Sequence, residues 1–186
     1  MPDVIEREVK LKLKGISIEE LKNKLLNDQM KYVGVEKQTD IYLNSKFRNF
    51  KETDEALRIR KVNDTAEITY KGPKISSKSK SREEITVVIN DENAMLKILQ
   101  KLDFYPVYSV SKERHTFIDN NFNICLDKVE GLGDFIEIEG INSDENRLLQ
   151  YINDFIKKYN INVEVERKSY LELLVEKNES ANSNSN

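Results

Sequence analysis

The chain has 186 residues and a formal net charge of −3, which fits one domain with a buried core and excludes the broad basic field of sequence-independent nucleic-acid binders. Its 34% charged residues and single cysteine, Cys125, indicate a polar protein without an intramolecular disulfide, as in a reducing compartment. Neither a membrane-spanning apolar run nor a signal-peptide core is present, so we expect a cytoplasmic protein that binds neither membrane nor nucleic acid.

The first predicted element is a strand, because residues 5–15 (IEREVKLKLKG) alternate strictly between apolar and charged side chains. Ser17 and Glu20 then form a capping-box pair, which predicts a helix that ends at about Met30. A short strand follows at 38–44 (QTDIYLN), and the polar stretch after it is typical of a loop.

The middle of the chain predicts a hairpin, a loop, a strand and a second helix. Residues 55–62 and 65–73 pair as a hairpin around an Asn-Asp turn. Residues 74–81 are rich in serine and lysine, which predicts a mobile loop, and its residues 74–80 could fold over a site as a lid or form a disordered hairpin. A strand at 82–90 leads to Asp91, which is placed to cap the next helix.

The last part of the chain predicts further strands and helices. The strands are expected at 107–119, 122–131 and 133–140, one helix at 143–160, and a short terminal helix at 169–177. About eight mostly antiparallel strands and three main helices indicate the α+β class. We expect a single domain over residues 1–176 and a disordered polar tail over 177–186.

The predicted strands share an unusual polar face. A single such strand indicates only a half-buried sheet with one wet side. Here arginine is frequent on these faces, and every main helix needs an apolar surface to cover. Eight twisted strands can close into a barrel with the helices outside and the charged faces lining the lumen. The acids expected there are Glu6, Glu8, Glu84, Asp127, Glu137 and Glu139, and the bases are Lys10, Arg58, Arg60, Lys71, Arg82, Lys112 and Arg114.

This combination of residue types predicts a polyphosphate site. Carboxylates two positions apart on a strand share a face within reach of one hard cation, and their oxygens suit Mg²⁺ or Mn²⁺. Arginine and lysine hold phosphate oxygens through charge-assisted hydrogen bonds. The chain has no glycine-rich Walker stretch, so the expected site is not a P-loop.

The motifs resemble the CYTH superfamily, also called triphosphate tunnel metalloenzymes. EREVK at Glu6–Lys10 matches the family's Glu-x-Glu-x-Lys signature and is followed, in family order, by DIY, ALRIR, TYKGP, SREE, SKERHTF, CLDKVEGLGDFIEIEG and SYLELL. The last two motifs are most similar to the class IV adenylyl cyclase branch. The resemblance covers nearly the whole sequence and implies an eight-stranded antiparallel closed β-barrel, or tunnel, with divalent-metal-dependent chemistry on triphosphates.

The resemblance also implies residue roles. The metal ligands would be Glu6, Glu8, Glu137 and Glu139, with Asp127 joining or orienting them and Glu84, or its neighbour Glu83, as a further acid. The phosphate chain would be held by Lys10, Arg58, Arg60, Lys71, Arg82, Lys112 and Arg114. The catalytic set would be Glu6, Glu8, Lys10, Glu137 and Glu139, with two Mg²⁺ or Mn²⁺ ions as cofactors. Relatives are commonly dimeric, so a homodimer is a possible state.

The leading interpretation is a triphosphatase that hydrolyses inorganic triphosphate, with nucleoside triphosphates as other substrates. The alternative is a class IV adenylyl cyclase that forms cyclic AMP and pyrophosphate from ATP. The residues expected in the lumen cannot distinguish these two functions, because the same basic residues would hold the phosphates in both reactions. A third reading, a non-catalytic polyphosphate- or nucleotide-binding module, predicts the loss of a metal acid, and none is missing. The absence of tryptophan argues against a thiamine triphosphatase.

Other polar and aromatic residues carry no predicted role in the site. His115 is out of phase with the basic residues beside it and is expected to be packed or at the surface. Cys125 is expected to fill the core. Asp40 is expected to act as a cap or turn residue, and Tyr42, Tyr70 and Tyr170 to anchor helices on the barrel.

Overall fold

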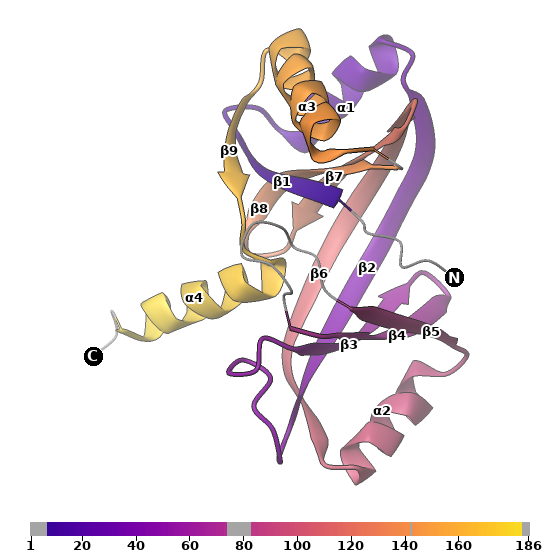
Figure 1. Ribbon diagram of the computed structural model, residues 1–186, viewed down its shortest axis with the longest axis vertical. Coiled ribbons are helices and arrows are strands. Elements are labelled where there is room, and N and C mark those ends of the chain that lie inside the picture. The colour runs from indigo at the N-terminus through magenta and orange to yellow at the C-terminus, as the bar shows by residue number, and fades with distance from the viewer. Residues whose placement is uncertain (1–6, 74–82, 142, 184–186) are drawn as a thin grey trace. The chain divides into compact units, whose positions relative to one another are not determined.

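The structure is a computed structural model that describes residues 7–73, 83–141 and 143–183 (Figure 1). Its fold is mixed α/β, with a large antiparallel sheet and four helices. In chain order the elements are β1 (Arg7–Lys14), α1 (Ile18–Asn27), β2 (Lys31–Ser45), β3 (Ala56–Val62), β4 (Thr65–Lys71), β5 (Glu84–Ile89), α2 (Glu92–Lys101), β6 (Phe104–Asp119), β7 (Phe122–Val129), β8 (Gly133–Gly140), α3 (Glu145–Tyr159), β9 (Asn162–Glu166) and α4 (Tyr170–Ser183). Within these ranges, every helix is too short or too polar to cross a membrane.

The strands are hydrogen-bonded in the order β5-β4-β3-β2-β6-β7-β8-β1-β9. The pairings with a defined register are antiparallel, which confirms the predicted antiparallel α+β arrangement. The ninth strand, β9, was not predicted, and it pairs with the second edge of β1. Between the described residues of β5 and β9, the two end strands, no pairing closes the sheet. The closed eight-stranded barrel therefore stays a prediction.

Local sequence signals set the ends of the helices. The side chain of Ser17 accepts a hydrogen bond from the Glu20 amide, and the Glu20 carboxylate accepts one from the Ser17 amide, so the predicted capping box opens α1. The side chain of Asp91 caps α2, as its position predicts. Helix α4 continues to Ser183, so residues 177–183 are helical where the sequence predicts a disordered tail.

The chain divides into two compact units, which we call unit 1 (residues 1–36 and 112–186) and unit 2 (residues 37–111). Helices α1 and α3 in unit 1 pack on the apolar face of its strands (Figure 1). The buried side chains of this core are Leu11, Leu13, Ile18, Leu21, Leu25, Phe117, Phe122, Ile124, Leu126, Ile136, Ile138, Leu148, Ile152, Phe155, Tyr159 and Ile161. The helices of unit 1 thus cover the side of the sheet that the sequence predicts they cover.

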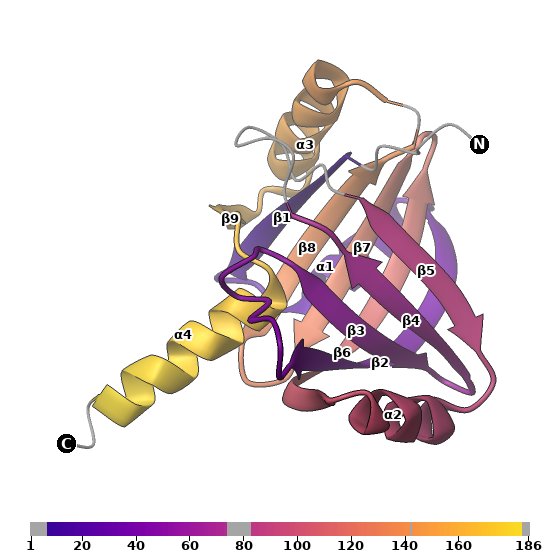
Figure 2. The ribbon, with the colours of Figure 1, turned by 60° about the horizontal axis from the view of Figure 1, so that its bottom comes forward.

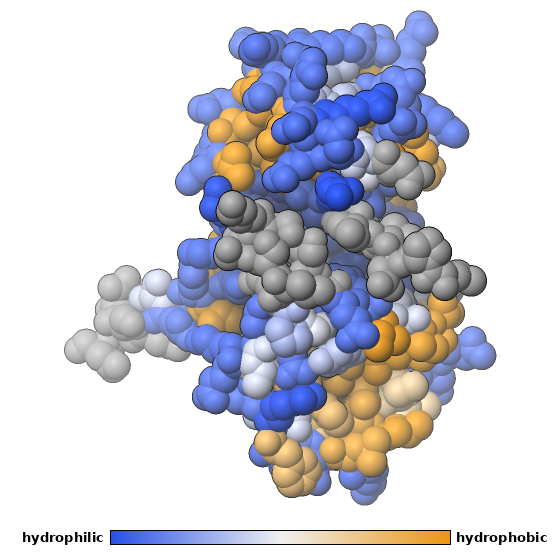
Figure 3. All heavy atoms as spheres, viewed as in Figure 1, coloured by the Kyte–Doolittle hydropathy of each residue, from blue (hydrophilic) through white to orange (hydrophobic). Residues whose placement is uncertain are grey.

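Unit 2 repeats this arrangement with one helix. Helix α2 packs on the apolar face of the strands (Figure 2), and its Leu99 joins a buried cluster with Leu43, Phe50, Leu57, Ile59, Ala66 and Ile89. Helix α2 has ten residues and leaves part of this face uncovered. Ile85 and Val87 of β5 remain 53% and 56% exposed, and an apolar area lies over β5 and α2 in Figure 3.

Candidate functional site

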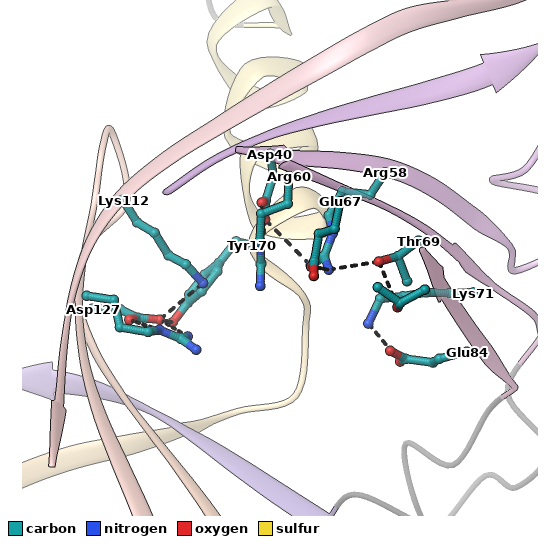
Figure 4. A network of polar contacts seen from close by, with 12 residues as sticks. Asp40, Arg58, Arg60, Glu67, Thr69, Lys71, Glu84, Lys112, Asp127 and Tyr170 are labelled. Atoms are coloured by element: carbon teal, nitrogen blue, oxygen red, sulfur yellow. Dashed lines mark hydrogen bonds and ion pairs between the residues drawn. The ribbon is translucent and has the colours of Figure 1, made fainter. Parts of the chain in front are cut away.

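Charged side chains gather in unit 1 on the side of the sheet opposite α1 and α3. The strand register places Lys10 opposite Glu137 and Arg114 opposite Asp127. Directly opposed residues share one side of a sheet, and so do residues two apart on one strand, so these four side chains lie on the same side. We define the unit 1 polar cluster as Lys10, Lys112, Arg114, Asp127, Glu137 and Tyr170, part of which is drawn in Figure 4.

Asp127 is the centre of the unit 1 polar cluster. Its carboxylate is fully buried and forms a two-point ion pair with Arg114, with Nε–Oδ1 and Nη2–Oδ2 distances of 2.6 and 2.5 Å. The Tyr170 hydroxyl donates to Oδ2 at 2.8 Å, and Lys112 Nζ lies 3.5 Å from the same oxygen. Both oxygens of Asp127 are therefore engaged by donors, which fits a role in orienting Arg114 rather than in ligating a metal ion.

Glu137 is held as an anion by the cations around it. Its Oε1 lies 3.3 Å from Lys10 Nζ, and its Oε2 accepts a hydrogen bond from Arg114. Burial alone would raise the pKa of Glu137, but the positive charges of Arg114, Lys112 and Lys10 outweigh burial and lower it. Burial likewise tends to lower the pKa of Arg114, and the bond to Asp127 with the nearby carboxylate charges raises it instead. Both groups stay charged at neutral pH.

The cations outnumber the acids in this cluster. Lys10, Lys112 and Arg114 face the two carboxylates of Asp127 and Glu137, and the exposed fractions of Lys10 and Lys112 are 4% and 7%. Buried charges need partners, because their removal from water is costly. Lys10, Lys112 and Arg114 are therefore a largely buried group of cations that suits an anion, and Glu8 and Glu139 lie on the same side of the sheet, two residues from Lys10 and Glu137.

Unit 2 carries a second group of charges, again on the side of the sheet away from its helix. Asp40 of β2 is buried and forms a two-point ion pair with Arg60, with distances of 2.6 Å to Nε and 2.8 Å to Nη2. Arg58 Nη2 donates to Glu67 at 3.3 Å and to the Thr69 hydroxyl at 3.4 Å. We define the unit 2 polar cluster as Asp40, Arg58, Arg60, Glu67, Thr69, Lys71 and Glu84, which Figure 4 labels.

Arg58 has one unsatisfied donor. Its side chain is 9% exposed, and its Nε–H is a buried donor without an acceptor in the described part of the chain. A buried donor without a partner is destabilising, and such groups are rare in folded proteins. An anionic ligand that accepted this hydrogen bond would remove the penalty.

The rest of the unit 2 polar cluster is paired or neutral. Lys71 Nζ lies 2.7 Å from Glu84 Oε1, and the hydroxyls of Thr69 and Thr86 are 3.0 Å apart. Tyr42 lies opposite Arg58 on the neighbouring strand. Burial and the charge of Asp40 raise the pKa of Tyr42 to about 12, so this phenol stays protonated at neutral pH.

The predicted metal ligands are only partly brought together. Glu8 and Glu139 lie directly opposite each other on β1 and β8, and two like charges in that position are destabilising unless a cation lies near them. Asn123 donates to Glu139 at 3.1 Å. Within the ranges that the structure describes, no three carboxylate, histidine or cysteine side chains form a group that could hold a metal ion. Of the predicted ligands, Glu8 and Glu139 are the pair that lies directly opposite each other, and Asp127, Glu137 and Glu84 form ion pairs with cations.

Two predicted site residues, Glu6 and Arg82, lie outside the described residues, as does the 74–80 loop that could act as a lid. The rest occupy the polar faces where the sequence places them. His115 is confirmed as a packed residue on the opposite side, where its Nδ1 lies 2.9 Å from the Tyr32 hydroxyl. Cys125 is buried as predicted, but it lies opposite Glu137 on the polar side of the sheet rather than in the apolar core of unit 1.

Four members of the polar clusters had no predicted role in the site: Asp40, Glu67, Thr69 and Tyr170. The prediction of Asp40 as a cap or turn residue was wrong, because it lies within β2 and pairs with Arg60. Its alternation with Gln38 and Tyr42 was a signal for the polar face. Tyr170 was expected only to anchor a helix, and its contact with Asp127, 43 residues away, has no local sequence signal.

The cavities described in unit 1 lie away from the unit 1 polar cluster. One of about 180 Å³ is lined by residues of α3 and by Met30 and Asp119, and a neighbouring one lies at the ends of α1 and α3. Asp119 there accepts a hydrogen bond from Tyr151, and Asp28 accepts one from Tyr159. Asp119 of β6 and Asp28 at the end of α1 thus stabilise the packing of α3, and each polar cluster remains a candidate site in its own unit.

Comparisons with known proteins identify similar sequences. The model of the CYTH domain family matches residues 4–172. A Methanocaldococcus jannaschii protein that carries the name of a proposed adenylate cyclase is 43% identical over 176 residues, which is 91% of this chain and 98% of that protein.

Solved structures show the same fold. The PH1819 protein from Pyrococcus horikoshii OT3 has a TM-score of 0.75 and 36% identity over 92% of this chain and 99% of its own. A Hippeastrum protein, described as a proposed adenylyl cyclase with a dominant triphosphatase activity, has a TM-score of 0.73 and 20% identity over 91% of this chain and 94% of its own. At that identity the second likeness shows the fold alone.

Proposed function

Because the chain belongs to the CYTH domain family, we propose that it is a divalent-metal-dependent triphosphatase that hydrolyses inorganic triphosphate, with nucleoside triphosphates as further substrates. Members of this family act on triphosphates. The observation that carries the proposal is the unit 1 polar cluster, where three cations face two carboxylates in a largely buried place. An anion of several charges is the ligand that such a cluster favours.

Phosphoryl transfer depends on positioning and on charge neutralisation more than on covalent help from the protein. Asp127 fixes the plane of the Arg114 guanidinium through two bonds, and Glu137 holds Lys10 in place. These cations stabilise the negative charge that grows on phosphate oxygens, and they do so strongly because the cluster is shielded from water. Glu137 is paired with Lys10 and Arg114, so its role in this proposal is that of a counter-ion.

The unit 2 polar cluster supports the same ligand class. Arg58 carries a buried N–H without an acceptor among the described residues, and phosphate oxygens are strong acceptors for guanidinium groups. Taken by itself, unit 2 therefore offers Arg58 as a donor suited to a phosphate ligand. Its neighbour Arg60, held by Asp40, is the second candidate donor in this unit.

Glu8 and Glu139 are the residues proposed to hold a divalent cation, together with Glu6 as the ligand expected from the family signature. Mg²⁺ or Mn²⁺ would supply Lewis acidity toward phosphate oxygens and a bound water of lowered pKa. A two-metal site remains part of the proposal. The closed antiparallel barrel is likewise proposed from the sequence resemblance.

A second candidate function is adenylyl cyclisation, which the name of the 43% identical relative favours. The same cations would bind the triphosphate of ATP, and the reaction would release pyrophosphate and cyclic AMP. The two functions differ in their products, and the cations of the clusters suit either reaction.

The proposal is tested with a matched pair of arginine variants. Lysine at position 114 cannot reproduce the two-point contact with Asp127, so Arg114→Lys is expected to lower kcat/KM for inorganic triphosphate at least about tenfold. Arg48→Lys is the control, because Arg48 is 56% exposed and contacts only Glu55 among the ion pairs described. Orthophosphate release is measured with Mg²⁺ and with Mn²⁺. Equal activity of both variants contradicts the role of the unit 1 polar cluster.

A further inference from the structure

Tyr170, the first residue of α4, lies inside the unit 1 polar cluster. Its side chain is 6% exposed, and its hydroxyl donates to Asp127 Oδ2 at 2.8 Å. The ring packs edge-on against Phe135, with 5.1 Å between the ring centroids. Phe135 is itself fully buried and lies opposite Asp127 on the adjacent strand. The start of α4 is therefore packed onto the charged side of the sheet.

The Tyr170 ring also contacts both lysines of the cluster. Lys10 Nζ lies 4.1 Å from the ring centroid and Lys112 Nζ lies 5.0 Å from it, within the range of cation–π attraction. Lys10 Nζ donates in addition to the backbone carbonyl of Lys168, at 3.2 Å. Lysine side chains are flexible and lose considerable entropy when they are held in one conformation. The residues that lead into α4 supply contacts that hold them before a ligand arrives.

We infer that Tyr170 is a positioning residue for phosphate binding: its ring holds Lys10 and Lys112, and its hydroxyl holds Asp127 and through it Arg114. This inference rests on the proposed function and adds the C-terminal helix to the binding machinery. Preorganised cations bind an anion more tightly, because less ordering remains to be done on binding. If α4 had a purely structural role, changes at Tyr170 would leave the affinity for phosphate unchanged.

The experiment changes the hydroxyl group and the electron density of the Tyr170 ring and keeps the shape of the ring. Tyr170→Phe removes the hydroxyl and keeps the ring, and 3,4,5-trifluorophenylalanine placed at position 170 withdraws electrons from the ring face. The control is Tyr151→Phe, because the Tyr151 hydroxyl makes a bond of the same kind and length, 2.8 Å to Asp119, away from the cluster. Calorimetry measures the Kd for tripolyphosphate, and steady-state kinetics measure KM and kcat.

We expect the Kd to rise about threefold in Tyr170→Phe and about a further fivefold with the trifluorinated ring, from the usual strengths of a hydrogen bond and of cation–π contacts. KM should follow Kd, while kcat changes less than about threefold. A lower folded fraction, in contrast, would reduce kcat and leave KM unchanged. Equal Kd values for phenylalanine and the fluorinated ring overturn the inference.

Chemical labelling of lysines gives a readout that needs no substrate. Lys10 and Lys112 should react slowly with an acylating reagent in the wild type and several-fold faster with the fluorinated ring, whereas the exposed Lys14 should react equally in both. Unchanged labelling of Lys10 and Lys112 overturns the inference. Wild-type protein that binds no tripolyphosphate overturns the proposed function, whereas equal triphosphate binding by the wild type and the variants overturns only the role of Tyr170.

Discussion

Arg114 and Asp127 face each other on β6 and β7 and are joined at two points, with Nε–Oδ1 and Nη2–Oδ2 distances of 2.6 and 2.5 Å. The carboxylate of this pair is fully buried, so neither partner can lose the other without leaving a charge poorly compensated. The pair thereby links the stability of unit 1 to the orientation of a guanidinium suited to phosphate.

Asp127→Asn is expected to destabilise the protein by about 3 kcal/mol or more, because it leaves Arg114 without its main counter-ion. The measurement is the free energy of unfolding from urea titrations. Asp154→Asn on the exposed face of α3 is the control, and it should change that free energy by less than about 0.5 kcal/mol. Similar values for the two variants would show that the buried ion pair adds no stability.

The stability of the protein should fall in acid partly through Glu137. The folded-state pKa of Glu137 is lowered below its usual 4.5 because its cationic neighbours outweigh its burial. This group therefore contributes stability that is present above about pH 4.5 and is lost as pH falls through the lower folded-state pKa. Unfolding free energies between pH 7 and pH 3 should decline less steeply in Glu137→Gln than in the wild type. An identical decline would contradict the lowered pKa.

Lys10 and Lys14 lie on the same strand, the first in the unit 1 polar cluster and the second at the surface. Lys10→Met keeps the length of a buried side chain and removes its charge, so the affinity for tripolyphosphate should fall about tenfold or more. Lys14 is 44% exposed and pairs with Glu164, so Lys14→Met should change the affinity less than about twofold. Calorimetric titration decides between them, and equal affinities would remove Lys10 from the binding site.

The ion pair between Asp40 and Arg60 should be energetically coupled. A double-mutant cycle with alanine at both positions is expected to give an interaction energy of about 1–3 kcal/mol, because Asp40 is buried and both of its oxygens accept from Arg60. The more exposed pair of Lys61 and Glu92 is the control and should give less than about 1 kcal/mol. Coupling no larger than that of the control would mean that Asp40 does not fix Arg60.

The sequence predicted what depends on local periodicity. The strict alternation around Lys10 set the strand and its charged side, and the pair of Ser17 and Glu20 set the start of α1. His115 was correctly separated from the site because its parity differs from that of Arg114. These are properties of a few consecutive residues, so the side of a strand can be determined without knowing its neighbours.

The features that were missed depend on contacts between distant segments. Tyr170 reaches Asp127 across 43 residues, and β9 is defined by its pairing with β1 rather than by its five-residue pattern. The expected grouping of carboxylates around metal ions includes Glu6, which lies outside the described residues, and stays a prediction. The alternation of strands places acids and bases on one face without saying which of them pair, and Asp127 and Glu137 pair with cations.

The most direct test of the account follows the products of the wild-type protein by phosphorus NMR, with tripolyphosphate and with ATP, in the presence of Mg²⁺ or Mn²⁺. The account predicts orthophosphate and pyrophosphate from tripolyphosphate, no cyclic AMP from ATP, and no reaction after the divalent ions are chelated. Cyclic AMP with pyrophosphate as the main products from ATP, and no cleavage of tripolyphosphate, would contradict it.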